Sequence, residues 1–176
     1  MLFWHVGATI ALIRYAFRDE SMDLRFLAFG AILPDLIDTP IGFALWSRFG
    51  TVRLASHTLL FATVLLAVVM VTTRRGRPRK RWMPLAVGVL IHLVLDGMWR
   101  SPATLWWPVL GWEFDATTYQ TVGSYLEWLL TDVRTWILEA VGLVYLAVLA
   151  RRSDLGDQGA REQLLRTGRV SAPIGR

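Results

Sequence analysis

The chain has 176 residues, enough for one domain and few for two, and 54% of them are apolar. This apolar content, gathered into long segments, excludes an ordinary soluble domain. The absence of cysteine excludes disulfides, thiolate metal sites and cysteine nucleophiles. The net charge of +5 does not indicate a nucleic-acid partner, because six of the 19 basic residues form one run at 74–81 between apolar segments, as in a juxtamembrane anchor.

Five segments are predicted to be membrane helices, which gives an all-α, polytopic membrane helix bundle. In chain order they cover residues 2–17, 25–46, 54–73, 83–100 and a last segment that ends at Ala150. A span needs about 20 apolar residues, so the first and fourth segments depend on packing within the bundle. Pro34 and Pro40 are predicted to break the second helix. The expected organisation is a membrane-embedded catalytic helical domain at 1–150 and a flexible cytoplasmic tail at 151–176.

The stretch 101–120 is predicted to be a non-helical loop at the membrane interface. It contains Trp106, Trp107 and Trp112 among prolines and glycines, and tryptophan favours the headgroup region. A role of this loop at the edge of a substrate site stays open. The stretch after it offers cap residues followed by apolar residues at helical spacing, so the last helix is expected to start well before the membrane.

The distribution of basic residues predicts the topology. Eleven lie near one set of helix ends and four near the other, where Arg48, Arg53, Arg100 and Arg134 are found. The positive-inside rule then places the N-terminus outside and the C-terminus in the cytoplasm.

Six ionisable residues are predicted to lie together in the outer half of the membrane. They are His5, Asp35, Asp38, His57, His92 and Asp96. An aspartate at the centre of a membrane helix costs about 2.5–3.5 kcal/mol unless it is paired, so such residues indicate a functional site.

The spacing of these residues and their chemistry favour a metal site. His92 and Asp96 are i,i+4 neighbours, and Asp35 and Asp38 are i,i+3 neighbours, so each pair lies on one helix face. Imidazole and carboxylate ligands suit zinc, with manganese as another possibility. A single histidine is often a packing residue, and an aspartate pair can form a proton relay. Three histidines and three aspartates at one depth favour metal binding or catalysis over these alternatives.

The segments GAILPDLIDTP, RLASHTLLFA and HLVLDGMWRSPATLWWP resemble a bacterial family of inner-membrane, membrane-bound metal-dependent hydrolases, which includes a LexA-regulated inner-membrane protein. The resemblance covers roughly residues 5–127. The residues that carry it are His5, Pro34, Asp35, Asp38, Arg53, Ser56, His57, Thr58, His92, Asp96, Gly123 and Glu127. The PDLID segment is one residue longer between its aspartates than the PDID spacing of relatives, which leaves the role of Asp38 open.

The order of histidines and aspartates is also similar to that of zinc-dependent phospholipase C, an all-helical enzyme with a cluster of zinc ions. This remote resemblance implies one ion at Asp35, His57, His92 and Asp96, and a second ion at His5 and Asp96. The further histidine ligands and the N-terminal tryptophan ligand of that enzyme have no counterpart here. The resemblance therefore implies one or two divalent ions.

The expected function is hydrolysis of a phosphoester in a lipid or lipid-linked substrate by metal-activated water. The site is expected to face the outer leaflet of the inner (cytoplasmic) membrane. Asp38 or Glu127 is expected to act as general base, Arg53 to bind the phosphate, and Glu139 is an additional candidate. A metal-ion or proton transporter that uses the same residues is the alternative, and a structural membrane subunit is a third interpretation. Membrane lipids are the expected partners, nucleic acid is not, and the oligomeric state stays open.

Overall fold

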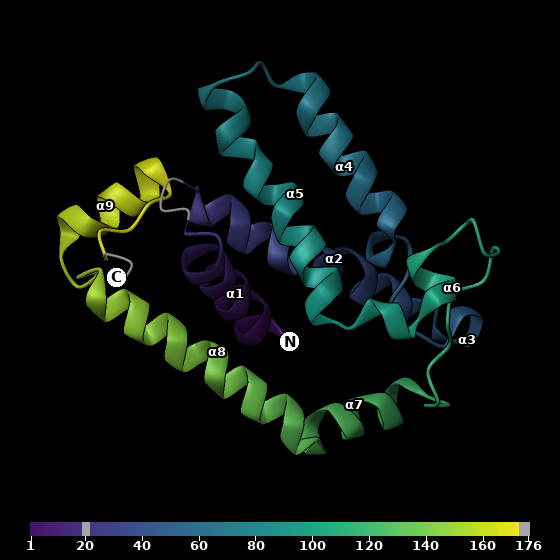
Figure 1. Cartoon of the computed structure of the whole chain (residues 1–176). Coiled ribbons are helices and arrows are strands. Elements are labelled where there is room, and N and C mark those ends of the chain that lie inside the picture. The colour runs from purple at the N-terminus through teal and green to yellow at the C-terminus, as the bar shows by residue number, and fades with distance from the viewer. Residues whose placement is uncertain (19–21, 173–176) are drawn as a thin grey trace.

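The computed structural model describes residues 1–18 and 22–172, and every regular element in this part of the chain is helical. The elements are α1 (Leu2–Ala11), a π-helical turn η1 (Leu12–Ala16), α2 (Leu24–Ala44), α3 (Trp46–Phe49), η2 (Ala55–His57), α4 (Leu59–Thr72), α5 (Arg77–Leu95), η3 (Met98–Arg100), α6 (Pro102–Leu105), α7 (Val122–Thr131), α8 (Val133–Arg152) and α9 (Gln158–Thr167) (Figure 1). The predicted all-α class is confirmed for the described residues.

Two of the described helices, α2 and α8, are long and apolar enough to cross a membrane. The continuous α1–η1 segment and α4 are shorter apolar helices. Helix α5 has 19 residues, but its first turns carry basic side chains, so its apolar part is shorter than the helix. The sequence predicted five spans, whereas the described residues contain two helices with the length and composition of a span.

The close crossing of α2 and α5 forms the centre of the molecule (Figure 1). Gly30 and Gly88 face each other at this crossing, where a Cβ atom on Gly30 would lie 3.1 Å from the Cα atom of Gly88. Small residues let two helix backbones come into contact. This contact brings the backbone of α2 within reach of side chains from the last turns of α5.

Helix α1 packs against α8 and α2. Its contact with α8 again depends on glycine, because a Cβ atom on Gly7 would lie 2.8 Å from the Cα atom of Gly142. Glu139 on α8 accepts a hydrogen bond from the backbone nitrogen of Phe3 at 2.8 Å. The first N–H groups of a helix have no partner within that helix, so Glu139 caps α1 from the neighbouring helix.

Helix α2 is continuous through Pro34 and Pro40, which corrects the predicted break in the second helix. Proline removes one backbone donor, but its fixed φ is close to the helical value. Packed neighbours can satisfy the groups that a proline leaves free. The side chain of Ser56 also donates to the carbonyl oxygen of Pro34 at 3.0 Å, which ties the segment around η2 to this part of α2.

The C-terminal segment, which was expected from the sequence to be a flexible tail, contains helix α9 and contacts the first turn of α2. The backbone nitrogen of Leu24 donates to the carbonyl oxygen of Gly168 at 2.7 Å, and Arg14 donates to the carbonyl oxygen of Ala172. Helix α9 ends at Gly168, whose φ of +72° lies in the left-handed region that glycine tolerates. The first N–H group of α2, that of Leu24, therefore finds an acceptor in the tail. Residues 173–176 of the expected tail lie outside the described residues.

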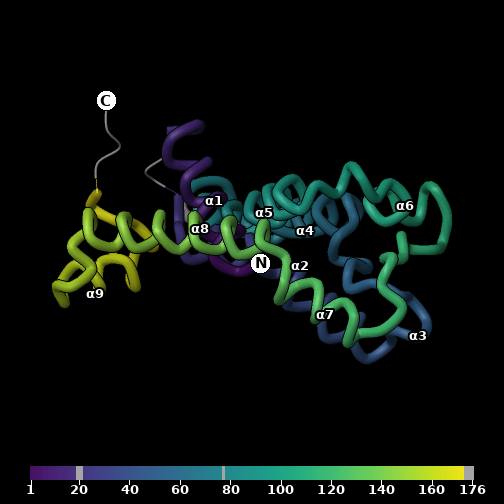
Figure 2. The backbone as a smooth tube through the Cα atoms, turned by 90° about the horizontal axis from the view of Figure 1, so that it is seen from below, coloured from purple at the N-terminus to yellow at the C-terminus, as the bar shows by residue number. Residues whose placement is uncertain are grey.

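Helix α9 and the loops around α3 and α6 lie at opposite ends of the molecule. Figure 2 shows α9 at one end and α3, α6 and α7 at the other. The loop after α6 is closed by two reciprocal hydrogen bonds, from the backbone nitrogen of Thr104 to Asp115 (2.9 Å) and from that of Asp115 to Thr104 (2.8 Å). Trp112 on this loop is 78% exposed, as expected for an interfacial loop. The stretch 101–120 also contains the short helix α6, which the sequence did not predict.

Candidate metal centre

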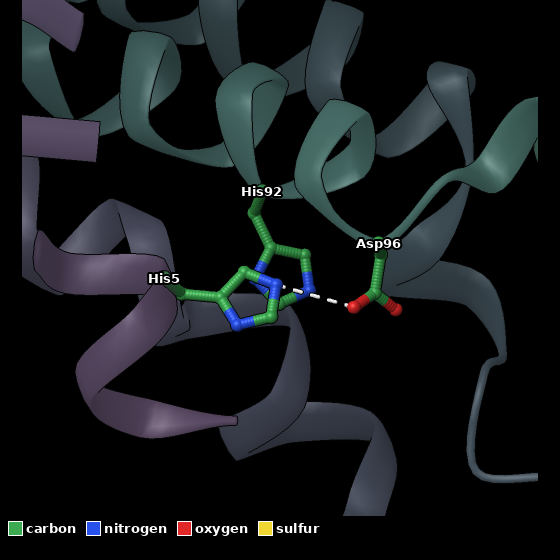
Figure 3. A group of neighbouring side chains, drawn as sticks. All are labelled: His5, His92 and Asp96. Carbon is green, nitrogen blue, oxygen red and sulfur yellow. Dashed lines mark ion pairs between the residues drawn. The ribbon is translucent and has the colours of Figure 1, made fainter. Parts of the chain in front are cut away.

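Residues far apart in the sequence converge beside the α2–α5 crossing. His5 comes from α1, Asp35 from α2, His57 from η2, His92 from α5, and Asp96 caps the end of α5. The three histidines have no exposed surface. Figure 3 shows the side chains of His5, His92 and Asp96 turned toward one another. Two overlapping groups of ligand atoms lie close enough to hold an ion, His5 with His92 and Asp96, and Asp35 with His57 and His92.

The imidazole rings of His57 and His92 face each other through their Nε2 atoms, which lie 3.2 Å apart. The Nδ1 atom of His92 lies 2.7 Å from the carbonyl oxygen of Ala31, which can only accept a hydrogen bond. The Nδ1 atom of His57 lies 2.8 Å from the carboxylate of Asp38. Both Nδ1 atoms therefore carry hydrogen, and in the neutral rings the two Nε2 lone pairs face each other. A cation shared by the two rings, or a proton on one of the two Nε2 atoms, would stabilise this arrangement.

The carboxylate of Asp35 completes a triangle with these two nitrogens. Its Oδ1 atom lies 3.4 Å from Nε2 of His57 and 3.8 Å from Nε2 of His92. In a tetrahedral zinc site with metal–ligand distances of 2.0–2.1 Å, two ligand atoms lie about 3.3–3.4 Å apart. The three atoms therefore have nearly the spacing of one face of such a site.

Asp96 and His5 extend the cluster on its other side. The Nε2 atom of His5 lies 3.1 Å from Oδ1 of Asp96 (Figure 3). Within the described chain this nitrogen has no partner in hydrogen-bond geometry, so the two atoms are close without being directed at each other. The Nδ1 atom of His5 contacts the carbonyl oxygen of Met1, which fixes the ring and leaves Nε2 as the ligand atom.

His92 belongs to both groups of candidate ligands, and this limits the number of ions. Its Nδ1 is engaged by Ala31, so only Nε2 remains, and one nitrogen binds one ion. The two-ion arrangement implied by the phospholipase resemblance therefore requires Asp96 to bridge the ions. The other oxygen of Asp96 lies 3.8 Å from Nε2 of His57, so its carboxylate does extend to both groups.

Asp38 does not have the position of a general base, which corrects that expectation. Its carboxylate accepts backbone N–H groups from Leu54 at 2.8 Å, Ser56 at 3.0 Å and His57 at 3.2 Å, besides the His57 ring. Only 1% of the residue is exposed. Asp38 thus holds the segment around η2 in place and orients His57 through its Oδ2 atom, which contacts all four of these groups.

Arg53 lies at the opening of the cluster. Its Nε atom donates to Oδ2 of Asp96 at 2.8 Å, and its side chain is 39% exposed. A cavity of about 590 Å³ begins here. Its walls are mostly apolar and aromatic, and are formed by Met1, Leu2, Ile32, Asp35, Leu36, Thr39, Pro40, Phe43, Thr51, Val52, Arg53, Asp96, Thr117, Tyr119, Tyr125, Leu126, Trp128, Leu129 and Thr135.

The structure does not bring Glu127 to this cavity, which corrects its expected role as general base. Tyr125, Leu126 and Trp128 line the cavity, whereas Glu127 lies on the exposed face of α7. A helix turns by about 100° per residue, so residues next to each other point in different directions. Glu139 lies on α8 and caps α1 through Phe3, and it is not one of the residues that line the cavity.

Sequence reasoning missed two features of the site. The first is the carbonyl oxygen of Ala31, which orients His92, and no sequence pattern marks a backbone acceptor. The second is the aromatic wall of the cavity, where Tyr125 lies 5.5 Å from Trp46 and 5.9 Å from Trp128, measured between ring centroids. The clustering of aromatic residues at 119–128 is the signal that could have indicated this wall.

A comparison with known families decides what this chain is related to. The family model of the YdjM inner membrane protein matches residues 3–155. The chain belongs to this family. The match includes all five candidate ligands and reaches past the end of α8. YdjM membership and two span-length apolar helices support a location in the bacterial inner membrane. No curated protein and no solved structure matches the chain.

Proposed function

We propose that this YdjM family member is a membrane-bound metal-dependent hydrolase with one divalent ion at its centre. His57, His92, Asp35 and Asp96 are the proposed ligands, with His5 as a fifth, and zinc fits the donor set best. The observation that carries this proposal is the 3.2 Å approach of the two Nε2 atoms, with each Nδ1 atom directed at its own acceptor. Two neutral histidines that only pack against each other would avoid this arrangement, because their facing Nε2 lone pairs repel each other.

The chemistry follows from which groups face the cavity. A divalent ion in such a site lowers the pKa of bound water toward neutrality and polarises the oxygen of the bond that is attacked. Asp35 and Asp96 are the site carboxylates that line the cavity. Asp96 is paired with Arg53, and Asp35 is paired with the N-terminal ammonium group at 3.5 Å. The side chain of Asp35 is 34% exposed and that of Asp96 is 7% exposed, so we propose Asp35 as the acceptor of the proton that the attacking water loses.

The cavity supports an amphiphilic phosphoester as substrate. The Nε atom of Arg53 is engaged by Asp96, and its terminal N–H groups remain to hold a phosphate oxygen beside the ligands. The rest of the wall includes Leu36, Phe43 and Leu129, which suit an acyl or isoprenoid chain. A lipid or lipid-linked phosphoester has both a phosphate group for Arg53 and an apolar chain for this wall.

We further propose that α1 with η1, α4 and α5 cross the membrane beside α2 and α8. In this arrangement the N-terminus lies outside, and the basic run at 74–81 and the C-terminal segment lie in the cytoplasm. The metal centre then faces the outer leaflet, and lipid reaches the cavity from within the membrane.

The test is hydrolysis by detergent-purified protein of a panel of phospholipids and isoprenoid phosphates, with and without a chelator. We expect turnover of at least one substrate, its loss on chelation and its recovery when zinc or manganese is returned. Arg53→Gln should lower turnover and keep the metal, whereas the matched variant Glu127→Gln should change neither. Absence of metal-dependent turnover across the whole panel would contradict the proposal.

One observation favours a metal-ion or proton transporter as the second candidate. Thr9 and Arg14 continue from His5 along α1 and are both buried, with Arg14 only 2% exposed. Buried polar groups beyond the cluster are what a conduction path requires. The test is ion uptake into proteoliposomes. Uptake by the unaltered protein that is lost in an Arg14→Leu variant would favour transport over hydrolysis.

A further inference from the structure

A second, smaller pocket lies between α2 and α5, away from the metal centre. Its volume is about 210 Å³, and it is lined by Arg25, Phe26, Phe29 and Arg81. Arg25 precedes Asp35 by ten residues in α2, which corresponds to about 15 Å along the helix axis. The pocket therefore shares no residue with the cavity at the metal centre.

The floor of this pocket is the ring of Phe26. The guanidinium carbon of Arg81 lies 5.5 Å from the centre of this ring, and that of Arg25 lies 6.0 Å from it. The ring of Trp82 packs against Phe26 with 4.5 Å between centroids. Contact with an aromatic face holds a guanidinium in a defined position, so both cations are oriented toward the same small volume.

The two arginines differ in how their charge is compensated. Arg25 donates to both carboxylate oxygens of Asp23, at 3.0 Å and 2.6 Å, and also to the carbonyl oxygen of Leu165. Arg81 has no carboxylate partner within residues 1–18 and 22–172. Among the described residues, the two guanidinium groups of this pocket thus have a single carboxylate partner, which favours an anion as a further ligand.

The apolar part of the pocket favours a lipid as the source of that anion. Phe29, one turn further along α2, is 46% exposed, and Trp82 is 43% exposed. Both side chains lie beside the first turns of a helix with the composition of a membrane span. The phosphate of a lipid can pair with the arginines while its acyl chain covers the exposed rings of Phe29 and Trp82. A free anion can only pair with the arginines.

We propose that this pocket binds the headgroup of an anionic phospholipid. The phosphate lies between Arg81 and the terminal N–H groups of Arg25 that Asp23 and Leu165 leave free. The acyl chain follows Phe29 along α2. Basic pockets between membrane helices are typical sites for anionic lipid headgroups. The site is independent of the proposed hydrolase activity.

The experiment compares lipid binding by three forms of the protein in detergent. Phosphatidylglycerol, phosphatidylcholine and inorganic phosphate are titrated separately, and bound lipid is counted by native mass spectrometry. We expect the unaltered protein to prefer phosphatidylglycerol over phosphatidylcholine. Arg81→Gln should weaken phosphatidylglycerol binding about fivefold. The matched variant Arg75→Gln removes the same charge from the same basic run outside the pocket and should change binding less than twofold.

A third variant separates the lipid from a free anion. Phe29→Ala should weaken phosphatidylglycerol binding, and inorganic phosphate should not compete with the lipid at millimolar concentration. Equal losses in Arg81→Gln and Arg75→Gln would overturn the proposal in favour of diffuse charge attraction. Binding of inorganic phosphate that saturates the pocket and displaces the lipid would overturn it in favour of a soluble anion. Each variant must unfold at the same temperature as the unaltered protein when both are in phosphatidylcholine. This control separates loss of the lipid site from loss of the fold.

Discussion

Substitution of Asp38 by asparagine separates a positioning role from direct metal binding. The carboxylate accepts from the Nδ1 atom of His57 and from backbone N–H groups of Leu54, Ser56 and His57. All of these groups contact Oδ2, so asparagine can place its carbonyl oxygen there, but its NH₂ group then faces the backbone N–H of Ser56, which lies 3.2 Å from Oδ1. The buried donors also exchange a charged acceptor for a neutral one, which costs about 1–3 kcal/mol of stability.

The same substitution weakens metal binding indirectly. Loss of a carboxylate that orients a ligating histidine lowers metal affinity by about 10–100-fold, which corresponds to about 1.4–2.8 kcal/mol. We therefore expect Asp38→Asn to bind zinc 10–100-fold more weakly in chelator competition, and its metal-free form to unfold at a lower temperature. Asp35→Asn is the matched control, because Asp35 is a proposed ligand with 34% side-chain exposure. It should lose more metal affinity and little metal-free stability.

Two results would refute this reasoning. Zinc affinity within twofold of the unaltered protein in Asp38→Asn would show that the orientation of His57 does not depend on the carboxylate. Complete loss of zinc with unchanged metal-free stability would show that Asp38 is itself a ligand, and that its backbone contacts contribute little.

The other predictions concern helix packing, the cavity and the tail. Gly142→Ala should destabilise the protein by about 1–3 kcal/mol in thermal unfolding, because a Cβ atom would lie 2.6 Å from the backbone nitrogen of Trp4; unchanged stability would argue against the α1–α8 contact. Arg53→Lys should lower kcat/KM for a phosphoester about tenfold without loss of metal, because lysine lacks the planar fork; full activity would exclude the phosphate role. Burial acts to raise the pKa of Asp23, but hydrogen bonds from Arg25 outweigh it and hold that pKa below its usual value. The contribution of Asp23 to stability is therefore present at neutral pH and lost as the pH falls through its lowered folded-state pKa. Asp23→Asn should be less stable than the unaltered protein at pH 7 and should approach it only below about pH 4, and a difference that does not change with pH would contradict this ion pair.

The sequence was sufficient to identify which ionisable residues come together, because membrane burial makes isolated charges costly. Six residues were grouped by depth in the membrane, and the structure brings five of them together as candidate ligands: His5, Asp35, His57, His92 and Asp96. The depth argument could not assign roles within the group. The role of Asp38 depends on backbone N–H groups of η2, and a sequence does not show where a backbone turns.

Other differences have equally specific physical causes. Pro34 and Pro40 were expected to break a helix that is continuous, because the fixed φ of proline is close to the helical value. Glu127 was expected at the site because it follows a family motif, but its position in α7 turns it outward. The tail was expected to be flexible because it is polar, and its contact with α2 through the N–H group of Leu24 could not be predicted, since no sequence pattern marks a backbone acceptor.

The most direct test of the metal centre is the metal content of the purified protein, measured by mass spectrometry beside a His57→Ala/His92→Ala double variant. Arg75→Gln serves as the control for purification and handling. We expect one zinc or other divalent ion per chain in the unaltered protein and the control, and none in the double variant. The same metal content in all three proteins, or none in any of them after incubation with divalent ions, would contradict the proposed centre.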